Sequence, residues 1–454
     1  MNKFFLVTII GILAFVSCKS GNDGKGLENI DYNYQLVEQR IHNGWNTTRK
    51  YCYLNVQDGS FLPLENIYSG TPFTDDYALV WTKDPESKEY LLNYYDKQCH
   101  ILENKYTSNM VSATVFSENR AWIVPKGCYP VLIDKEGNRI EIDIRLQEVY
   151  PFNNGVCLGW NQEGQALIIG LDGKCVKNLG NMYIPVFPTF INGILLVRKT
   201  DGLFGALDTK GNEIISCEWG SFLYNYQKPD DIETYLDIAK WLNKGFIRVQ
   251  STGGWGCIDL KGKVVVEPQN ASIDIEGDWF RVQESKDNWT SEVVWLNHSG
   301  KLMYGPITKA EEFGDGPIMP IPSPSSSSKY SSKYGYVNRQ GKVITDFEFE
   351  QAYSFGDSGH AHAIKNNEYY LIDKNGKSTL LKIGNYTLLD IVHMPNRFWV
   401  VNGEYRTLIN EKGEPFFEPG DYNICNISTY LSRAQICKYH EVGIISAAIT
   451  DADD

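Results

Sequence analysis

The amino-acid sequence predicts an all-β protein, a tandem array of about ten antiparallel β-meander repeats of roughly 38 residues each. The first observation is a recurring phrase, in which an apolar strand, a turn of the form Asp/Asn-x-x-Gly and a second apolar strand follow one another. Its clearest copies are residues 202–215, 253–266 and 333–345. The second is the composition, since 28 Tyr, 20 Phe and 11 Trp residues suit pleated, half-buried surfaces. Units of this size cannot bury a core alone, so neighbours are expected to share one.

The turn of the phrase sets the period of the array. Asp or Asn at its first position accepts hydrogen bonds from the backbone ahead, and Gly at its last position takes the positive φ that closes the hairpin. Neighbouring turn glycines are 35 to 41 residues apart, except for one interval of 51; they are Gly137, Gly173, Gly211, Gly262, Gly300, Gly341, Gly376 and Gly413. Degenerate copies at Asp58-Gly59 and at residues 96–99 bring the count to about ten. Cys99 replaces Gly in the second of these, so this copy is expected to be strained.

A second phrase, Phe-x-x-Gly, precedes several of these hairpins. It occurs at residues 152–155, 190–193 and 313–316, and residues 194–197 show the apolar strand that follows. A full unit therefore contains an aromatic residue, a turn and three or four short strands, which fit into about 38 residues.

Two segments interrupt the array. The long interval between Gly211 and Gly262 contains apolar residues at helical spacing, which predict a short inserted helix over residues 230–243, with Asp230 as its cap. Residues 320–328 read Pro-Ile-Pro-Ser-Pro-Ser-Ser-Ser-Ser, which predicts a polar, low-complexity loop.

The first 18 residues predict an export signal rather than part of the fold. Lys3 supplies a positive charge, residues 4–16 are apolar but too short to span a bilayer comfortably, and Ser17-Cys18 closes the segment. A small residue before Cys, with a polar stretch behind it, resembles the lipobox of bacterial lipoproteins. The resemblance implies that Cys18 becomes the lipid-modified first residue, which anchors the protein to a membrane. The alternative is an ordinary secretory signal cut nearby.

The chain is thus expected to divide into four parts. Residues 1–18 form the lipoprotein signal peptide, residues 19–50 a tether and N-terminal cap, residues 51–425 the repeat array, and residues 426–454 a C-terminal cap and tail.

The cysteines do not indicate a metal or redox site. None of the 10 forms Cys-x-x-Cys, and subtracting Cys18 leaves an odd number. Cys157, Cys217 and Cys257 adjoin apolar strand phrases and are expected to pack as buried free thiols. Because export permits disulfides, Cys425 and Cys437 are the pair to test first.

The full unit resembles a known repeat. The order Phe-x-x-Gly, apolar strand, aromatic-Gly, apolar pair, Asp-x-x-Gly-Lys and a second apolar pair is similar to the WG repeat, which occurs in tandem copies in bacterial proteins. Trp255-Gly256 matches the dipeptide that names the repeat, and Phe204-Gly205 and Tyr334-Gly335 carry other aromatic residues there.

Other copies keep only part of this pattern. Residues 131–134 and 370–373 retain the strand and the turn but lack the aromatic-Gly pair. The resemblance covers most of residues 51–425 and is clearest over 190–380. It implies a β-rich repeat scaffold, and it implies no shared catalytic residues and no cofactor.

Several motifs that suggest chemistry are explained by the repeat. Residues 356–359 read Gly-Asp-Ser-Gly, as around a trypsin-like nucleophile, but they fall where the repeat places its Phe-x-x-Gly phrase. His360 and His362 have a spacing that can bind a metal on a strand, yet no third ligand is evident, so a packed or solvated pair is expected. We therefore predict no catalytic, cofactor or metal residues.

The composition limits the classes of molecule that the protein is expected to bind. A formal net charge of −13 without a run of Lys or Arg argues against nucleic-acid binding. Trp81, Trp122 and Trp279 are expected to be core or strand-pair aromatics rather than a sugar-binding platform.

Two architectures remain open, a propeller-like arrangement of blades or an open superhelical solenoid. Because rings usually hold 4 to 8 blades, about ten units argue against one simple closed ring. The predicted function is a non-enzymatic, lipid-anchored scaffold of the cell envelope, located at the outer membrane, that binds a protein or glycan. One alternative is an envelope-associated hydrolase acting on polysaccharide, and a third possibility is a structural spacer or assembly factor.

Overall fold

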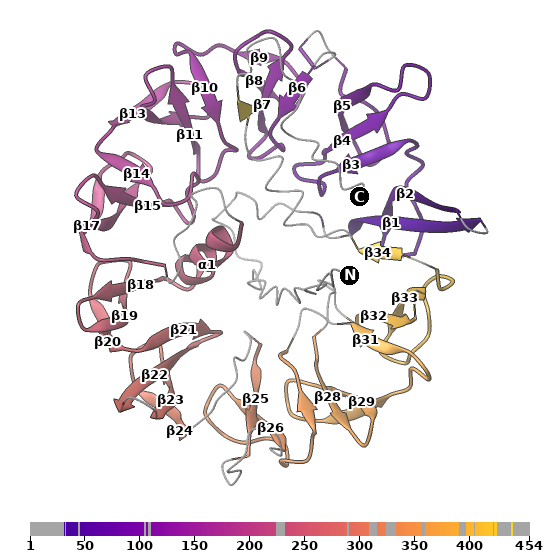
Figure 1. The fold of residues 1–454 in the computed structure, drawn as a ribbon, viewed down its shortest axis with the longest axis vertical. Helices are drawn as coiled ribbons and strands as arrows, with labels where there is room; N and C mark the ends of the chain where they lie inside the picture. Colours follow the sequence, from indigo (N-terminus) through magenta and orange to yellow (C-terminus); the bar gives the residue numbers. More distant parts are fainter. Residues whose placement is uncertain are drawn as a thin grey trace, which may run out of the picture.

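The computed structural model describes most of the chain between residues 31 and 438. The described residues are 31, 33–43, 46–103, 106–107, 110–223, 232–287, 290–307, 316–323, 333–355, 359–389, 396–403, 405–420, 422–424 and 437–438. Within them the protein forms ten small antiparallel sheets and one helix, and the sheets are arranged around a central axis as in a β-propeller (Figure 1). The predicted all-β repeat array is thereby confirmed.

The first five sheets take up the N-terminal half of the ring. Sheet 1 contains β34 (Tyr422–Ile424), β1 (Tyr34–Asn43) and β2 (Asn46–Asn55); sheet 2 contains β3 (Ile67–Gly70), β4 (Ala78–Lys83) and β5 (Tyr90–Tyr95); sheet 3 contains β6 (Met110–Ala113), β7 (Arg120–Pro125), β8 (Val131–Asp134) and β9 (Arg139–Ile140); sheet 4 contains β35 (Cys437–Lys438), β10 (Leu146–Val149), β11 (Val156–Asn161), β12 (Ala166–Gly170) and β13 (Cys175–Gly180); sheet 5 contains β14 (Tyr183–Pro185), β15 (Ile194–Lys199), β16 (Phe204–Asp208) and β17 (Glu213–Trp219).

The other five sheets complete the ring. Sheet 6 contains β18 (Phe246–Ser251), β19 (Gly254–Asp259) and β20 (Val264–Asn270); sheet 7 contains β21 (Ser272–Glu276), β22 (Trp279–Asp287), β23 (Thr290–Asn297) and β24 (Leu302–Ile307); sheet 8 contains β25 (Ile318–Pro322) and β26 (Tyr334–Asn338); sheet 9 contains β27 (Gln351–Ala352), β28 (Ala361–Lys365), β29 (Glu368–Ile372) and β30 (Ser378–Leu381); sheet 10 contains β31 (Thr387–Leu389), β32 (Arg397–Asn402) and β33 (Tyr405–Asn410). Helix α1 (Ile232–Asn243) precedes sheet 6.

In eight of the ten sheets the strands form a meander that follows chain order from the axis outward, as β21 to β24 show in Figure 1, whereas sheets 1 and 4 carry β34 and β35 beside their chain-order strands. The turn between the first and second strands and the turn between the third and fourth strands therefore lie on one face of the ring, which we call the turn face. The turn between the second and third strands lies on the opposite face. Both repeated sequence phrases thus form the turn face.

The Asp/Asn-x-x-Gly turns have the predicted geometry. All eight turn glycines named above have φ between 76° and 87°. In the turn before β30, Asp373 Oδ1 accepts hydrogen bonds from the amides of Asn375 at 2.8 Å and Lys377 at 2.9 Å. Cys99 has φ of 65°, so the copy that lacks glycine places a side chain in the left-handed region, as expected.

Turn glycines also interlock neighbouring sheets. A Cβ atom on Gly376 of sheet 9 would lie 2.7 Å from the carbonyl oxygen of Ile344 in the outer part of sheet 8. The same close approach to a carbonyl of the preceding sheet joins Gly173 to Glu141, Gly300 to Val265, Gly341 to Met303 and Gly413 to Lys382. Glycine is therefore required at these positions for two reasons: the turn needs a positive φ, and the contact between sheets leaves no room for a side chain.

Hydrogen bonds on the turn face connect the first turns of sheets 2 to 5. The amide of Asn119 donates to Asp75 Oδ2, the amide of Gly155 to Glu118 Oε2, and the amide of Gly193 to Asn154 Oδ1, at 2.7 to 2.8 Å. Each turn has two consecutive residues with positive φ, as in a type I′ hairpin turn. Phe152 and Phe190, from the second phrase, are buried beneath these turns. Residues 313–315 lie outside the described part.

Helix α1 takes the place of the innermost strand of sheet 6. Its described part runs from Ile232 to Asn243, and the predicted start and cap at Asp230 lie outside the described residues. Ile238, Ala239 and Leu242 pack into a core that spans sheets 5 and 6. Asn192 continues the turn-face chain by donating from Nδ2 to the carbonyl of Leu242 at 3.1 Å. Figure 1 shows the helix inside the ring.

The two ends of the array meet. Strand β34 pairs antiparallel with β1 as the inner strand of sheet 1, with Val37 opposite Ile424. Gly59 of sheet 1 approaches Phe416 of sheet 10, with a Cβ position 3.1 Å from its carbonyl oxygen, so the interlock recurs here. Arg397 Nε donates to the carbonyl of Val56 at 2.9 Å. The expectation that about ten units would not form one closed ring is therefore wrong, because sheet 1 borrows its inner strand from the far end of the chain.

Two further boundaries differ from the expectations. Residues 320–322, assigned to a polar loop, lie in β25, where their prolines occupy an edge strand that tolerates a missing amide. Residues 324–328 lie outside the described part. The expected start of the array at residue 51 falls inside β2, so residues assigned to the tether belong to sheet 1.

Burial of the cysteines and tryptophans largely follows the expectations. Cys157 and Cys257 are buried free thiols, whereas Cys217 is half-buried. Burial raises the pKa of the Cys257 thiol to about 12. Cys425 lies outside the described residues, so its pairing with Cys437 stays a prediction. Trp122 and Trp279 are core residues, and Trp81 is half-buried against the core of sheets 2 and 3.

The contact between a turn glycine and the preceding sheet, which we call the interlock, predicts that alanine destabilises the protein more at Gly376 than at Gly262. Gly262 and Gly376 close turns of the same type in sheets 6 and 9, with φ of 80° and 87°. Only Gly376 has atoms within 4 Å of its Cβ position. Alanine at either site introduces backbone strain of about 1–3 kcal/mol. Gly376→Ala adds a clash between sheets and is expected to lower the free energy of unfolding by about 1–3 kcal/mol more than Gly262→Ala. Urea unfolding of the two variants measures this difference, and equal losses would show that the interlock contributes nothing.

Candidate interaction surface

The structure describes some, but not all, of the residues that the sequence singles out for chemistry. Cys18, the predicted lipidation site, lies outside the described residues, and so do residues 356–358 of the Gly-Asp-Ser-Gly motif. Among the described residues, no group of three or more His, Cys, Asp or Glu side chains could hold a metal ion. No helix in this part of the chain is both long and apolar enough for a membrane span.

The histidine pair is a packing feature. His362 in β28 is 7% exposed, and its ring stacks on Tyr353 with centroids 4.1 Å apart and planes 15° apart. Burial lowers the pKa of His362 to about 4. His360 lies just before the strand and faces Phe398 of sheet 10, with ring centroids 6.3 Å apart. The structure therefore places the two imidazoles against different partners.

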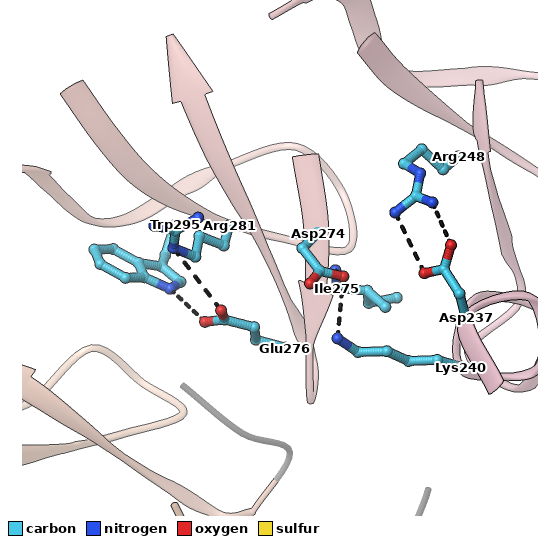
Figure 2. A network of polar contacts seen from close by, with 8 residues as sticks. All are labelled: Asp237, Lys240, Arg248, Asp274, Ile275, Glu276, Arg281 and Trp295. Carbon is cyan, nitrogen blue, oxygen red and sulfur yellow. Dashed lines mark hydrogen bonds and ion pairs between the residues drawn. The ribbon is translucent and has the colours of Figure 1, made fainter. Parts of the chain in front are cut away.

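The strongest concentration of buried charge surrounds α1. Arg248 of β18 is 2% exposed and forms a bidentate ion pair with Asp237 of the helix (Figure 2). Its guanidinium lies over the rings of Trp241 and Trp255, 5.7 Å and 5.5 Å from their centroids. Burial raises the pKa of the Asp237 carboxyl, and the Arg248 cation opposes this shift. Arg is suited to this role because its planar group both stacks and pairs in bidentate fashion.

The network continues into sheet 7. Lys240 Nζ donates to Asp274 Oδ1 at 3.0 Å, which ties α1 to β21. At the end of β21, Glu276 is 2% exposed and accepts a hydrogen bond from Trp295 Nε1 at 2.9 Å. Arg281 Nε lies 3.9 Å from Glu276 Oε1. Figure 2 shows that the members of each pair point toward one another. The network fixes α1 in the ring, and its charges are used within the protein.

A different feature marks the inner edges of sheets 2, 3 and 4. The first strand of each sheet has a register shift at its second residue, between Ile67 and Ser69, between Met110 and Ser112, and between Leu146 and Glu148. The extra residues are Tyr68, Val111 and Gln147, and all three are exposed. A β-bulge redirects a side chain out of the pleat. Because the bulge is at the same position in three consecutive sheets, these residues form an arc around the axis, toward the opposite face.

Aromatic and apolar residues extend this arc in sheet 2. Tyr68 is 38% exposed and Tyr90 is 39% exposed, and their rings lie 4.6 Å apart with planes inclined by 60°. Lys83 Nζ lies 5.4 Å from the centroid of Tyr90, and Leu91 beside it is 45% exposed. Val111 of sheet 3 is a further exposed apolar residue, at 42%, and exposed apolar residues of this kind mark interaction sites where they lie together. We call Tyr68, Tyr90, Leu91 and Val111 the apolar arc.

The inner edge of β10, in the third of these sheets, is already paired with another strand. The backbone of β35 pairs antiparallel with β10, with Lys438 opposite Glu148 and Cys437 opposite Val149. No sequence signal pointed to this pairing or to the bulges, because both depend on where the strands lie in the ring. Exposed positions such as Tyr68 and Val111 could only be recognised once each first strand was located.

Comparison with known proteins supports the repeat assignment. The model of the WG containing repeat matches residues 255–286 and 334–370, which include Trp255-Gly256 and Tyr334-Gly335. The glycine of the first dipeptide is required sterically, since a Cβ on Gly256 would clash with the carbonyl oxygen of Val266 on the next strand. No curated protein matches the sequence.

Solved structures show only distant similarity. BamB from Moraxella catarrhalis aligns with a TM-score of 0.30 and 13% identity over 69% of this chain and 95% of its own. A eukaryotic initiation factor aligns with a TM-score of 0.29 and 11% identity over 64% of this chain and 94% of its own. A putative TolB from Agrobacterium tumefaciens aligns with a TM-score of 0.22 and 10% identity over 40% and 80%. At these scores the similarity carries no inference about partners or location.

Burial of His362 predicts a pH dependence of stability. Its pKa is about 4 in the folded protein and near 6.5 in the unfolded chain, so the unfolded state binds the proton first as the pH falls. As the pH falls from about 6.5 to 4, His362 therefore lowers the free energy of unfolding, and the loss reaches about 3 kcal/mol below pH 4. His362→Phe should unfold with a smaller loss over this window than the wild type, as measured by urea unfolding at each pH. The same change at the exposed His100 is the control, and an unaltered pH profile for His362→Phe would contradict the assignment.

Proposed function

We propose that this chain, in which two segments match the WG repeat, is an exported, lipid-anchored scaffold that binds a partner protein through the apolar arc and catalyses no reaction. The single observation that carries the proposal is the repetition of an exposed, bulged residue on the inner edges of consecutive sheets, with Tyr68 and Val111 at its apolar end. Because the bulge recurs at the same position in three sheets, it is a conserved part of the repeat architecture within this chain rather than a local irregularity.

The chemistry of the arc favours a protein partner. Tyrosine is enriched among the residues that dominate binding energies, because it offers a large, rigid surface with a polar end. Tyr68 and Tyr90 form a pair of such residues, flanked by Lys83 and by the aliphatic Leu91. A broad surface of this kind suits recognition of a folded or extended protein segment.

The proposal of a non-catalytic role rests on how the charged side chains around α1 are paired. Asp237, Arg248, Lys240 and Asp274 are engaged with one another around α1 and hold the helix against the sheets. A hydrolase needs carboxylates that converge on a substrate site. The apolar arc, by contrast, offers contact surface rather than titrating groups.

The anchoring part of the proposal rests on the N-terminal sequence. The apolar stretch of residues 4–16 followed by Ser17-Cys18 supports export and acylation of Cys18 at the cell envelope, with the outer membrane as its site. Acyl chains contribute about 0.8 kcal/mol per buried methylene, so a multiply acylated Cys18 would keep the ring at a membrane surface.

Metabolic labelling tests the anchor. Cells that express the protein and grow with a radiolabelled fatty acid should label the parent chain but not the Cys18→Ser variant, because only the thiol accepts a thioether-linked lipid. Fractionation should then find the parent with membranes and the variant released from them. Label retained by Cys18→Ser, or absent from the parent, would refute acylation at this residue.

Site-specific photo-cross-linking tests the binding surface. A photoreactive phenylalanine analogue placed at Tyr68 or at Val111 should give the same discrete adduct in cells, because both positions belong to the apolar arc. The matched control is Val176 on the outer strand β13, which is 45% exposed but outside the arc. An identical adduct from position 176, or none from 68 and 111, would contradict the assignment.

A further inference from the structure

The inner edge of β10 is already used as a template for another strand. Tyr150 donates its amide to the carbonyl of Leu158 on β11, so the amide of the preceding residue, Val149, points to the other edge of β10. Cys437 lies opposite Val149 on that edge, in antiparallel register. The end of the chain thus adds a strand to the inside of the ring.

This self-pairing is short. It joins two residues of β35 to two of the four residues of β10, whereas strands in sheets usually run for about five or six residues. A longer extended segment would form more backbone hydrogen bonds along the same edge. The pairing is therefore a weak competitor for any segment that covers all of β10.

Inner edges differ around the ring in whether they can accept a strand. In β14, Pro185 holds the position equivalent to Val149, because Val186 donates its amide to Leu196 as Tyr150 does to Leu158. Proline has no amide to donate, and Pro320 and Pro322 likewise lie in β25 at the inner edge of sheet 8. Proline on an edge strand prevents strand addition. The first strands of sheets 2, 3 and 4 contain no proline.

The surroundings of β10 suit an extended protein segment. Gln147 is the exposed bulge residue of β10 itself, and β35 also contacts β6 and β7 of sheet 3, next to the exposed Val111. A strand on this edge would run beside the apolar arc. Main-chain pairing would provide affinity, and the arc would select among side chains.

We propose that the inner edge of β10 is a strand-accepting site for an extended segment of the partner protein, and that Cys437–Lys438 occupy it as a built-in competitor. The inference rests on the proposed scaffold function and adds to it the form of the ligand and the means of its regulation. A partner segment binds by displacing the end of the chain from β10.

The test uses the full chain and a synthetic peptide of residues 434–441, with Ser at the position of Cys437, carrying a fluorescent label. Binding is followed by fluorescence anisotropy. The Cys437→Pro variant removes the competing pairing, so it should bind the probe about tenfold more tightly than the wild type, as for an edge that is self-occupied in about nine tenths of the molecules. Hydrogen exchange at the Val149 amide should be faster in Cys437→Pro than in the wild type when no peptide is present.

Two variants in the Cys437→Pro background separate the amide from the side chain. Val149→Pro removes the donor and introduces the residue that β14 already carries at this position, so probe binding should be lost. Val149→Ala shortens the buried side chain but keeps the amide, so binding should persist.

Equal probe affinity in the wild type and Cys437→Pro, or equal binding by the two Val149 variants, would overturn the proposal. If Val149→Pro does not fold, unchanged exchange at Val149 in Cys437→Pro overturns it equally. Cross-linking at Tyr68 and Val111 does not involve the peptide, so failure of the scaffold function is observed separately.

Discussion

The structure depends on the contact between each sheet and the next. Sheets of two to five short strands are too small to be stable alone, and each core cluster in the ring is shared by neighbouring sheets. The turn glycine brings the backbone of one sheet against the outer carbonyl of the preceding one, as Gly376 does with Ile344. A residue with a side chain would separate the sheets. The same glycine closes the turn, so one residue determines both the local hairpin and the spacing between sheets.

Closure of the ring follows from this constraint. Sheet 1 begins with a hairpin that has no inner strand of its own, and β34 from the other end of the array supplies it. Val37 and Leu54 then share a core with Trp399 and Leu408 of sheet 10. Helix α1 solves a related problem inside the ring, since it covers the inner edge of β18 and buries its charges in pairs such as Asp237 with Arg248. Three of the other first strands, β3, β6 and β10, carry the exposed bulges.

The sequence predicts the features that are local. The turn of Asp373 to Gly376 and the helix ending at Asn243 follow from short-range hydrogen bonding and periodicity. Features set by distant segments could not be predicted. The turns at Asp75-Asp76 and Glu118-Asn119 lack glycine, so they did not match the Phe-x-x-Gly phrase although they have its geometry. Prolines 320 and 322 suggested a loop because nothing local shows that their strand lies at an inner edge. The apolar arc was missed for the same reason, since the exposure of Tyr68 depends on its sheet's place in the ring.

Hydrogen exchange monitored by mass spectrometry tests the closed ring most directly. The comparison is between the full chain and a chain that ends at Gly420, which lacks β34. In the closed ring β34 pairs with β1, so peptides from residues 34–43 should lose protection in the shortened chain while those covering β15 to β17 on the far side retain it. Equal protection of residues 34–43 in both chains would contradict closure by β34, and the ring would then have to be held by packing alone.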